Sequence, residues 1–217
     1  MKLFLLFALV AEVFDGVRIT PIQHASLMIE AGGKVIYMDP AQGQYEGLPA
    51  ADLILLTDTH GDHLQPGVIA KLRKAGTALM GPAAAAEKVQ GMQVIRNGET
   101  RRWEGWTIEA LPMYNIKRTA YHEKGRGNGY LMSYRGKRFY FAGDTENIPE
   151  MRGLRDIDAA FLPMNLPYTM TPEEAAEAAR VIKPKVVYPY HYRGADLSVF
   201  QKALEGTGIE VRLRKWY

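Results

Sequence analysis

The stretch ADLILLTDTHGDH at residues 51–63 constrains the fold more than any other part of the chain. Its apolar run, 53–57, lacks polar alternation, which is typical of a strand buried on both faces. Such a strand needs further secondary structure over each face, so a single exposed sheet is excluded. The chain has 217 residues, 47% of them hydrophobic, which is enough for one sizeable core. We therefore expect a single domain over residues 1–217.

Short β-rich runs and a few helices make up the rest of the pattern. Strands are expected at 17–22, 26–30, 34–39, 53–57, 77–80, 106–113, 129–144 (a hairpin turning at Arg135-Gly136), 157–164, 185–192 and 209–217. Helices are expected at 66–76, 82–89, 171–182 and 196–206. In the clearest helix Thr171 is the expected N-cap and Glu174 completes a capping box. A strand block followed by helices occurs twice, which predicts an α/β fold with layers of helix, sheet, sheet and helix.

Polar side chains follow several of the expected strands at the points where those strands end. The residues are Asp58, His60, Asp62, His63, Tyr114, Asn115, Asp144 and His191. Strand ends converge at one edge of a sheet, where loops on a rigid scaffold form functional sites. The whole set points to a site far more strongly than any one segment does.

The spacing within residues 57–63 suits metal binding. Residues two apart in an extended or turning loop can point the same way, so Asp58 and His60 can share one metal ion. Asp62 and His63 then point elsewhere and can serve a second ion. Carboxylate oxygen and imidazole nitrogen are both competent ligands for zinc. The chain has no cysteine, so thiolate sites and disulfides are excluded.

Seven stretches together resemble the metallo-β-lactamase superfamily: HASLMIE, KVIYMDP, ADLILLTDTHGDHLQP, FYFAGDTENIPEM, IDAAFLPMN, TMTPEEAAEAA and PKVVYPYHY. The resemblance runs from about residue 18 to the C-terminus. It is to the small hydrolase branch that includes the ascorbate-6-phosphate lactonase-like proteins, in a subgroup with aspartate in place of the first motif histidine. It implies the four-layer αββα sandwich of the metallo-β-lactamase type.

The resemblance also implies a ligand set. His60 matches a ligand of the first metal, and the second-metal site is complete with Asp62, His63, Asp144 and His191, of which Asp144 usually bridges the two metals. The first site departs from the family pattern, because Asp58 replaces a histidine and Asn115 occupies the position expected for the third histidine. His60 is then its only imidazole unless His122 swings in. Zinc is expected, as one or two ions, with Mn²⁺, Mg²⁺ or Fe²⁺ as alternatives at this harder first site.

Each of these residues also has a purely structural interpretation. Asp62 can be a helix N-cap, Asp144 an Asx-turn, and Asp58 a turn residue. His60, His63 and His191 can be ordinary turn or strand-end histidines, Asn115 a backbone cap and His122 a solvated loop histidine. Arg118 and Arg126 can bind an acidic substrate group, although most loop arginines do not. His24 is interpreted as structural.

The predicted function is that of a metal-dependent hydrolase acting on a small ester, lactone, amide or phosphoester. Metal-bound water becomes hydroxide near neutral pH and attacks the substrate. Asp62 orients this nucleophile, while His122 or a tyrosine, Tyr168 or Tyr192, assists the developing charge or the leaving group. The alternative is a non-catalytic binding protein stabilised by metal, because the altered first site can leave one structural ion.

A nuclease or phosphodiesterase ranks lower. The net charge is only +3, and the basic residues are scattered rather than gathered into a stripe. We expect a small-molecule substrate and no nucleic-acid partner, and homo-oligomerisation is left open.

Residues 1–11 join Lys2 to an apolar run that is too short to span a membrane. This pattern favours a signal-peptide remnant and a periplasmic or secreted protein, with a first strand and a cytoplasmic protein as the alternative.

Overall fold

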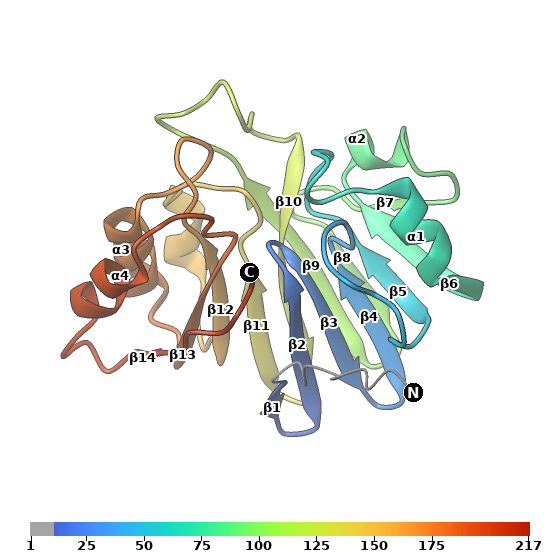
Figure 1. Ribbon diagram of the computed structural model, residues 1–217, viewed down its shortest axis with the longest axis horizontal. Coiled ribbons are helices and arrows are strands. Elements are labelled where there is room, and N and C mark those ends of the chain that lie inside the picture. Colours follow the sequence, from blue (N-terminus) through green and yellow to red (C-terminus); the bar gives the residue numbers. More distant parts are fainter. Residues whose placement is uncertain (1–10) are drawn as a thin grey trace, which may run out of the picture.

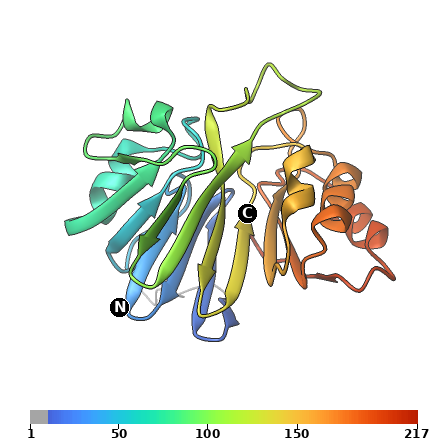
Figure 2. The ribbon, with the colours of Figure 1, turned by 180° about the vertical axis from the view of Figure 1, so that it is seen from behind.

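A computed structural model of the protein describes residues 11–217, so the signal-peptide prediction lies outside the described residues except for Ala11. Two seven-stranded sheets pack against each other, with helices over their outer faces (Figure 1 and Figure 2). This is the predicted four-layer αββα sandwich. Within the described part of the chain, none of the helices has the length and apolar character that crossing a bilayer requires.

The first sheet follows the order of the chain. Its strands are β1 (Glu12–Phe14), β2 (Val17–Gln23), β3 (Ser26–Ala31), β4 (Lys34–Met38), β5 (Ala51–Leu55), β6 (Arg73–Gly81) and β7 (Gln93–Val94). Strands β1 to β4 form an antiparallel meander, and β4 to β7 are parallel. Gly32 and Gly33 both have positive φ in the β3–β4 hairpin, the backbone that a tight two-residue turn requires.

The second sheet repeats this plan. Its strands are β8 (Thr100–Trp103), β9 (Trp106–Met113), β10 (Gly127–Tyr134), β11 (Lys137–Phe141), β12 (Ala159–Pro163), β13 (Val186–Tyr190) and β14 (Glu210–Val211). Strands β8 to β11 are antiparallel, and β11 to β14 are parallel. The β10–β11 hairpin turns at Arg135-Gly136, as predicted. Every residue of β12 and β13 is buried, which fits their continuous apolar sequence.

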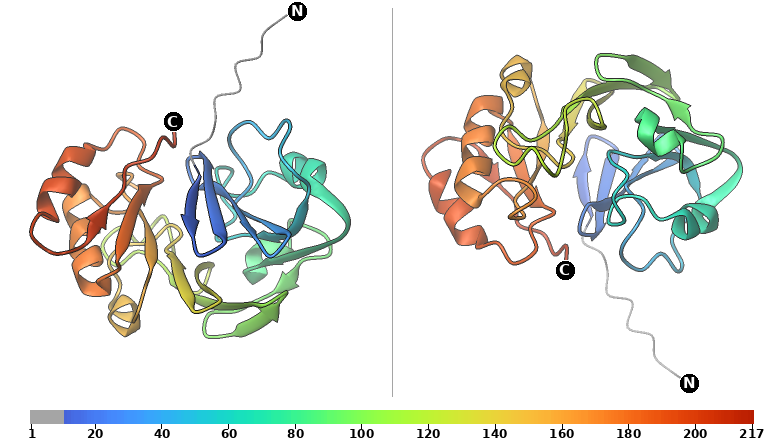
Figure 3. Two further views of the ribbon diagram at one scale, coloured as in Figure 1. Left: turned by 90° about the horizontal axis from the view of Figure 1, so that it is seen from below. Right: turned by 90° about the horizontal axis from the view of Figure 1, so that it is seen from above.

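Helices cover the outer face of each sheet (Figure 3). Helices α1 (Pro66–Leu72) and α2 (Ala83–Ala86) pack on the first sheet, while α3 (Pro172–Ile182), α4 (Leu197–Ala203) and the 3₁₀ turn η1 (Pro149–Gly153) pack on the second. The predicted capping box of α3 is confirmed: Glu174 N donates to Thr171 Oγ1 at 3.1 Å, and Thr171 N donates to Glu174 Oε2 at 2.9 Å. Asp196 caps α4.

The core lies between the two sheets. It joins Leu53 and Leu55 of the first sheet to an aromatic stack in the second, where Phe161 packs 4.7 Å from Phe141 and 4.8 Å from Tyr188 between ring centroids. Burial of this much apolar surface is the main stabilising contribution to such a fold. The sandwich holds the strand ends, and therefore the loops after them, in fixed relative positions.

Two sequence predictions need correction. The helix predicted at 66–76 ends at Leu72, because Arg73 begins β6 and Ala51 pairs with it. The strand predicted at 209–217 is confined to β14. Arg212 N still donates to Val187 O of β13 at 3.0 Å, but after it the chain leaves the sheet, and the side chains of Arg212 and Arg214 bond to Glu12 of β1. In both cases tertiary pairing overrides the local pattern.

Glu12 joins the two sheets through its buried carboxylate. Its Oε2 accepts hydrogen bonds from Tyr188 Oη at 2.9 Å and Arg212 Nη1 at 2.8 Å, and its Oε1 accepts one from Arg214 Nε. Burial alone would raise the pKa of Glu12, but these partners outweigh it and hold the pKa below the ordinary value of 4.5. A carboxylate with a lowered pKa stabilises the folded protein above its ordinary pKa, and the stabilisation is lost as pH falls.

We therefore predict that Glu12→Gln lowers the free energy of unfolding by about 1–3 kcal/mol at neutral pH. The deficit relative to wild type should shrink as pH falls below 4.5 in chemical-denaturation measurements. Asp15→Asn is the matched control, because Asp15 is exposed and its ion pair with Lys137 should contribute less than about 1 kcal/mol. Equal stability losses in the two variants would contradict the prediction.

Candidate metal centre

Four loops bring the predicted site residues together at one edge of the sandwich. The β5–α1 loop carries Asp58, His60, Asp62 and His63, and the β9–β10 loop carries His122. Asp144 follows β11, and His191 follows β13. Three groups of side chains have ligand atoms within 4.8 Å of one another: Asp58 with His60 and His122, His63 with Asp144 and His191, and His24 with Asp62 and His191.

The second cluster contains Asp62, His63, Asp144 and His191. The Nε2 atoms of His63 and His191 each lie 3.2 Å from a carboxylate oxygen of Asp144, namely Oδ2 and Oδ1 respectively. Asp62 Oδ2 lies 3.5 Å from His191 Nε2, and Asp62 Oδ1 lies 4.0 Å from His63 Nε2. The four residues implied by the family resemblance for the second metal therefore surround one point.

The first cluster contains Asp58, His60 and His122. Asp58 Oδ2 contacts His60 Nδ1 and lies 3.8 Å from His122 Nε2. His122 Nε2 also lies 3.2 Å from Asp144 Oδ2, the oxygen that faces His63. Asp144 thus stands between the two clusters, in the position of a bridging ligand. The structure supplies a second imidazole to the first cluster from His122.

Buried atoms without hydrogen-bonding partners support a metal centre. The Nε2 atoms of His63 and His191 and the Oδ1 atom of Asp144 are buried and make no hydrogen bond, although His191 and Asp144 approach within 3.2 Å. Buried polar atoms are normally paired, and leaving them unpaired is costly. Ligand atoms that approach closely without hydrogen-bond geometry are expected around a shared cation. The donor set of imidazole and carboxylate fits divalent transition metals.

Asp144 is an ionised carboxylate despite its burial. Burial alone would raise its pKa, but the neighbouring His191 and His63 outweigh burial and hold the pKa well below the ordinary value. The pKa of Asp58 is also lowered, because the hydrogen bond from His60 and the charge of His63 outweigh the effect of burial. Both carboxylates are therefore ionised at neutral pH, as metal binding requires.

Two of the candidate ligands, His63 and His122, are oriented by hydrogen bonds from their Nδ1 atoms. His63 Nδ1 bonds to Asp39 Oδ2 at 2.8 Å, and Asp39 is itself held by the backbone N–H and the hydroxyl of Thr57. His122 Nδ1 lies 3.2 Å from the carbonyl oxygen of Tyr168. Each bond fixes a tautomer that leaves Nε2 free to face the centre. Asp39 was not among the predicted site residues, although it too follows directly on a strand.

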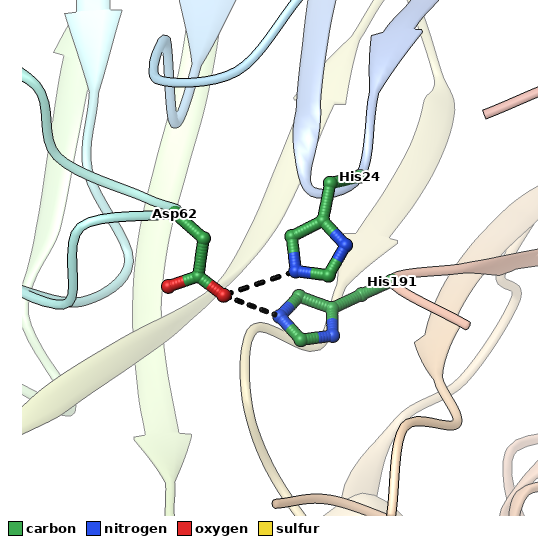
Figure 4. Close-up of side chains that lie close together, drawn as sticks. All are labelled: His24, Asp62 and His191. Carbon is green, nitrogen blue, oxygen red and sulfur yellow. Dashed lines mark hydrogen bonds and ion pairs between the residues drawn. The ribbon is translucent and has the colours of Figure 1, made fainter. Parts of the chain in front are cut away.

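His24 belongs to the centre, contrary to its structural interpretation from sequence. It lies in the β2–β3 turn, and its Nε2 donates to Asp62 Oδ2 at 3.0 Å (Figure 4). Its Nδ1 contacts the hydroxyl of Tyr217, whose oxygen accepts a hydrogen bond from Arg193 N at 3.1 Å. Because the Tyr217 hydroxyl accepts from Arg193, its own proton can be donated to His24 Nδ1. The ring proton of His24 is then on Nε2 and points to Asp62. Burial lowers the pKa of His24 and outweighs the opposing effect of Asp62, so the ring is neutral.

The backbone around His24 is unusual as well. His24 and His191 both have positive φ, at 58° and 47°, which costs a non-glycine residue roughly 1–2 kcal/mol. Their rings lie 3.7 Å apart between centroids, and His191 N donates to the carbonyl oxygen of His24 at 3.1 Å. Strain of this kind is concentrated at functional sites. Nothing in the spacing of QHAS indicates this arrangement, because it depends on where β13 ends.

Other predicted residues have different surroundings. The amide nitrogen of Asn115 donates to the carbonyl oxygens of Arg118 and Tyr168, while its Oδ1 is buried without a partner, so its role as a ligand stays a prediction. Arg118 pairs with Glu146 and Glu174. The Tyr192 hydroxyl donates to the carbonyl oxygen of Arg214. Helix α1 has Gln65 rather than Asp62 as its N-cap.

The fold and these residues match known proteins. Residues 18–191 match the model of the β-lactamase superfamily domain. The chain therefore belongs to the β-lactamase superfamily and has the metallo-β-lactamase fold. Within the superfamily its relatives include a UPF0173 metal-dependent hydrolase of Pyrococcus furiosus, 33% identical over 219 residues, covering 92% of this chain and 96% of the relative. The UPF0173 metal-dependent hydrolase of Thermus thermophilus is also 33% identical, covering 89% and 94% respectively.

Solved structures agree with this assignment. A crystal structure from Parabacteroides distasonis, assigned as a metal-dependent hydrolase, superposes with a TM-score of 0.94 at 41% identity and covers 96% of this chain and all of that one. Igni18, a metallo hydrolase from Ignicoccus hospitalis, superposes with a TM-score of 0.78 at 26% identity, covering 92% and 95%. The protein is thus a hydrolase of the metallo-β-lactamase fold, in the UPF0173 group of metal-dependent hydrolases.

The hydrogen bond from His24 to Asp62 gives a prediction. His24→Ala removes the donor that orients Asp62, and partners of this kind contribute about 10–100-fold to metal affinity. We expect a loss of that size in the affinity for Zn²⁺, used as the probe ion and measured by competition with a chromogenic chelator. His24→Gln is the matched control, because its amide can still donate to Asp62, and it should retain most of the affinity. Wild-type affinity in His24→Ala would contradict the prediction, provided that the unfolding temperatures match.

Proposed function

We propose that seven side chains hold two divalent metal ions and that the centre hydrolyses a small ester, lactone, amide or phosphoester. The proposed ligands are Asp58, His60 and His122 for the first ion, Asp62, His63 and His191 for the second, and Asp144 for both. The observation that carries the proposal is the position of Asp144, which lies 3.2 Å from three histidine nitrogens that belong to both clusters. A binding protein stabilised by one structural ion would not need this arrangement.

A divalent metal held by these residues would lower the pKa of water towards neutrality and would act as a Lewis acid toward the scissile group. The chain itself provides the opening to solvent and the orientation of the reactants. The side chains of His60 and Asp62 are 40% and 31% exposed, whereas the other proposed ligands are buried, so substrate approaches over these two residues. Asp62 is held by His24 and orients the nucleophile. His122 or the hydroxyl of Tyr168, whose side chain is accessible, assists the leaving group.

The first site is proposed to have a harder donor set than a site of three histidines. Its ligands are two carboxylates, Asp58 and Asp144, and two imidazoles, His60 and His122. Replacing an imidazole by a carboxylate favours harder ions, so Mn²⁺ or Fe²⁺ competes with zinc more effectively there than at a site of three histidines. The second site has the same donor composition, with carboxylates from Asp62 and Asp144 and imidazoles from His63 and His191, so the two sites are proposed to bind the same range of divalent ions.

The finer family placement is also a proposal. The aspartate at position 58 and the stretch YHEKGRGNGY support a subgroup within the small lactonase-like branch of the superfamily. The scattered charge supports a small-molecule substrate rather than nucleic acid. The fold alone does not select the substrate, since related frameworks carry many chemistries.

The test is hydrolysis by the metal-loaded protein of a panel containing aryl esters, lactones, an amide and phosphate mono- and diesters. We predict that Asp144→Asn lowers kcat/KM on any active substrate by at least about 100-fold and reduces metal content from two ions per chain. Metal is counted by mass spectrometry of the same samples. Asp196→Asn, which affects only the cap of α4, is the control and should keep wild-type activity. Unchanged hydrolysis by Asp144→Asn would refute the proposal.

A further inference from the structure

Arg126 lies against the exposed side of the first cluster. It precedes β10, and its Nη2 donates to Thr59 Oγ1 at 2.9 Å and lies 3.1 Å from His60 Nε2. Its Nε lies 3.6 Å from Asp58 Oδ1. The guanidinium therefore touches two residues that we assign to the first metal. Its side chain is 33% exposed, comparable to Asp62 and His60, so it shares their opening to solvent.

Part of the Arg126 guanidinium remains available to bind an anion. An arginine carries five N–H donors in a planar fork that matches a carboxylate or phosphate group. Among residues 11–217, the side-chain hydrogen bonds of Arg126 involve Nη2 alone, and Nη1 makes none. The ion pair with Asp58 through Nε is long, at 3.6 Å. An incoming anion can thus bond to Nη1 without displacing the contacts that hold the side chain in place.

Other cations of the same loop are committed to nearby carboxylates. Arg118 pairs with Glu146 and Glu174, and Lys124 pairs with Glu150 at 2.7 Å. Lys117 also pairs with Glu174, at 2.7 Å. Arg126 differs because it points to the metal ligands instead. A second cation lies beside it: Lys88 Nζ donates to the carbonyl oxygen of Thr59 at 3.1 Å. Two cations, Arg126 and Lys88, therefore both bond to Thr59 at this edge of the site.

We propose that Arg126 binds an anionic group of the substrate and so selects esters, lactones, amides or phosphoesters that carry a carboxylate or phosphate near the scissile bond. The inference rests on the proposed function, since it assigns the substrate class of that same site. The competing role for Arg126 is to neutralise the extra negative charge that Asp58 brings to the first cluster. That role predicts a change in metal binding and no selectivity between charged and neutral substrates.

A pair of chromogenic esters separates the two roles. The 4-nitrophenyl monoester of succinic acid carries a free carboxylate, and the corresponding succinamic acid ester is its neutral isostere. With metal-loaded wild type, the anionic ester should have the lower KM. Arg126→Gln should raise KM for the anionic ester by about tenfold or more, and should change KM for the neutral ester less than twofold. Lys124→Gln, which removes a charge from the same loop, is the matched control and should behave as wild type. Equal effects of Arg126→Gln on both esters would overturn the inference.

Binding of the anion at Arg126 can also be tested when neither ester is hydrolysed. Titration calorimetry on the metal-loaded protein compares succinate with succinamate, the acid products of the two esters. Succinate should bind wild type more tightly than succinamate, and Arg126→Gln should abolish the difference while metal content stays at the wild-type value. If neither ester is hydrolysed but this result holds, the hydrolase proposal fails and the anion site stands. If succinate binds wild type and Arg126→Gln equally, the anion site is refuted whatever the activity.

Discussion

The site depends on one buried carboxylate, that of Asp144, which faces three histidine nitrogens from three different loops. An isolated carboxylate at this depth would be strongly disfavoured, because burial opposes ionisation. The surrounding imidazoles outweigh burial and keep it ionised. The sandwich places the ends of β11 and β13 and the β5–α1 and β9–β10 loops around Asp144. Hydrogen bonds then orient the individual ligands: Asp39 accepts one from His63, the Tyr168 carbonyl accepts one from His122, and His24 donates one to Asp62.

Asp58 changes the electrostatics of this arrangement. A first cluster with three neutral imidazoles would leave the charge of its metal less compensated, and a carboxylate there reduces the attraction of the centre for anions. Arg126 lies at the opening of the cluster, with its Nε 3.6 Å from Asp58 Oδ1. In the proposed centre Asp58 influences which ion the first site binds, and Arg126 binds the anionic group of the substrate.

Much of the fold could be predicted from the sequence because buried strands and helix caps leave recognisable residue patterns. The continuous apolar runs of β5, β12 and β13 could only be strands covered on both sides, and the capping box of α3 marked its start. The set of strand-end polar residues also predicted six ligand candidates that the structure groups together, namely Asp58, His60, Asp62, His63, Asp144 and His191. It did not predict His24 or the place of His122, because both depend on loop paths. Residues 114–126 form a long connection without periodicity, and only its folded course shows that His122, seven residues beyond Asn115, reaches Asp144.

X-ray diffraction from crystals of the metal-loaded protein, collected on both sides of the metal absorption edge, tests the central claim most directly. The account predicts two anomalous peaks about 3.5–4 Å apart, as in other two-metal sites. One should be coordinated by Asp58, His60 and His122 and the other by Asp62, His63 and His191, with Asp144 bound to both. A single peak in the second cluster under saturating metal, with Asp58 bound to no ion, would contradict the account.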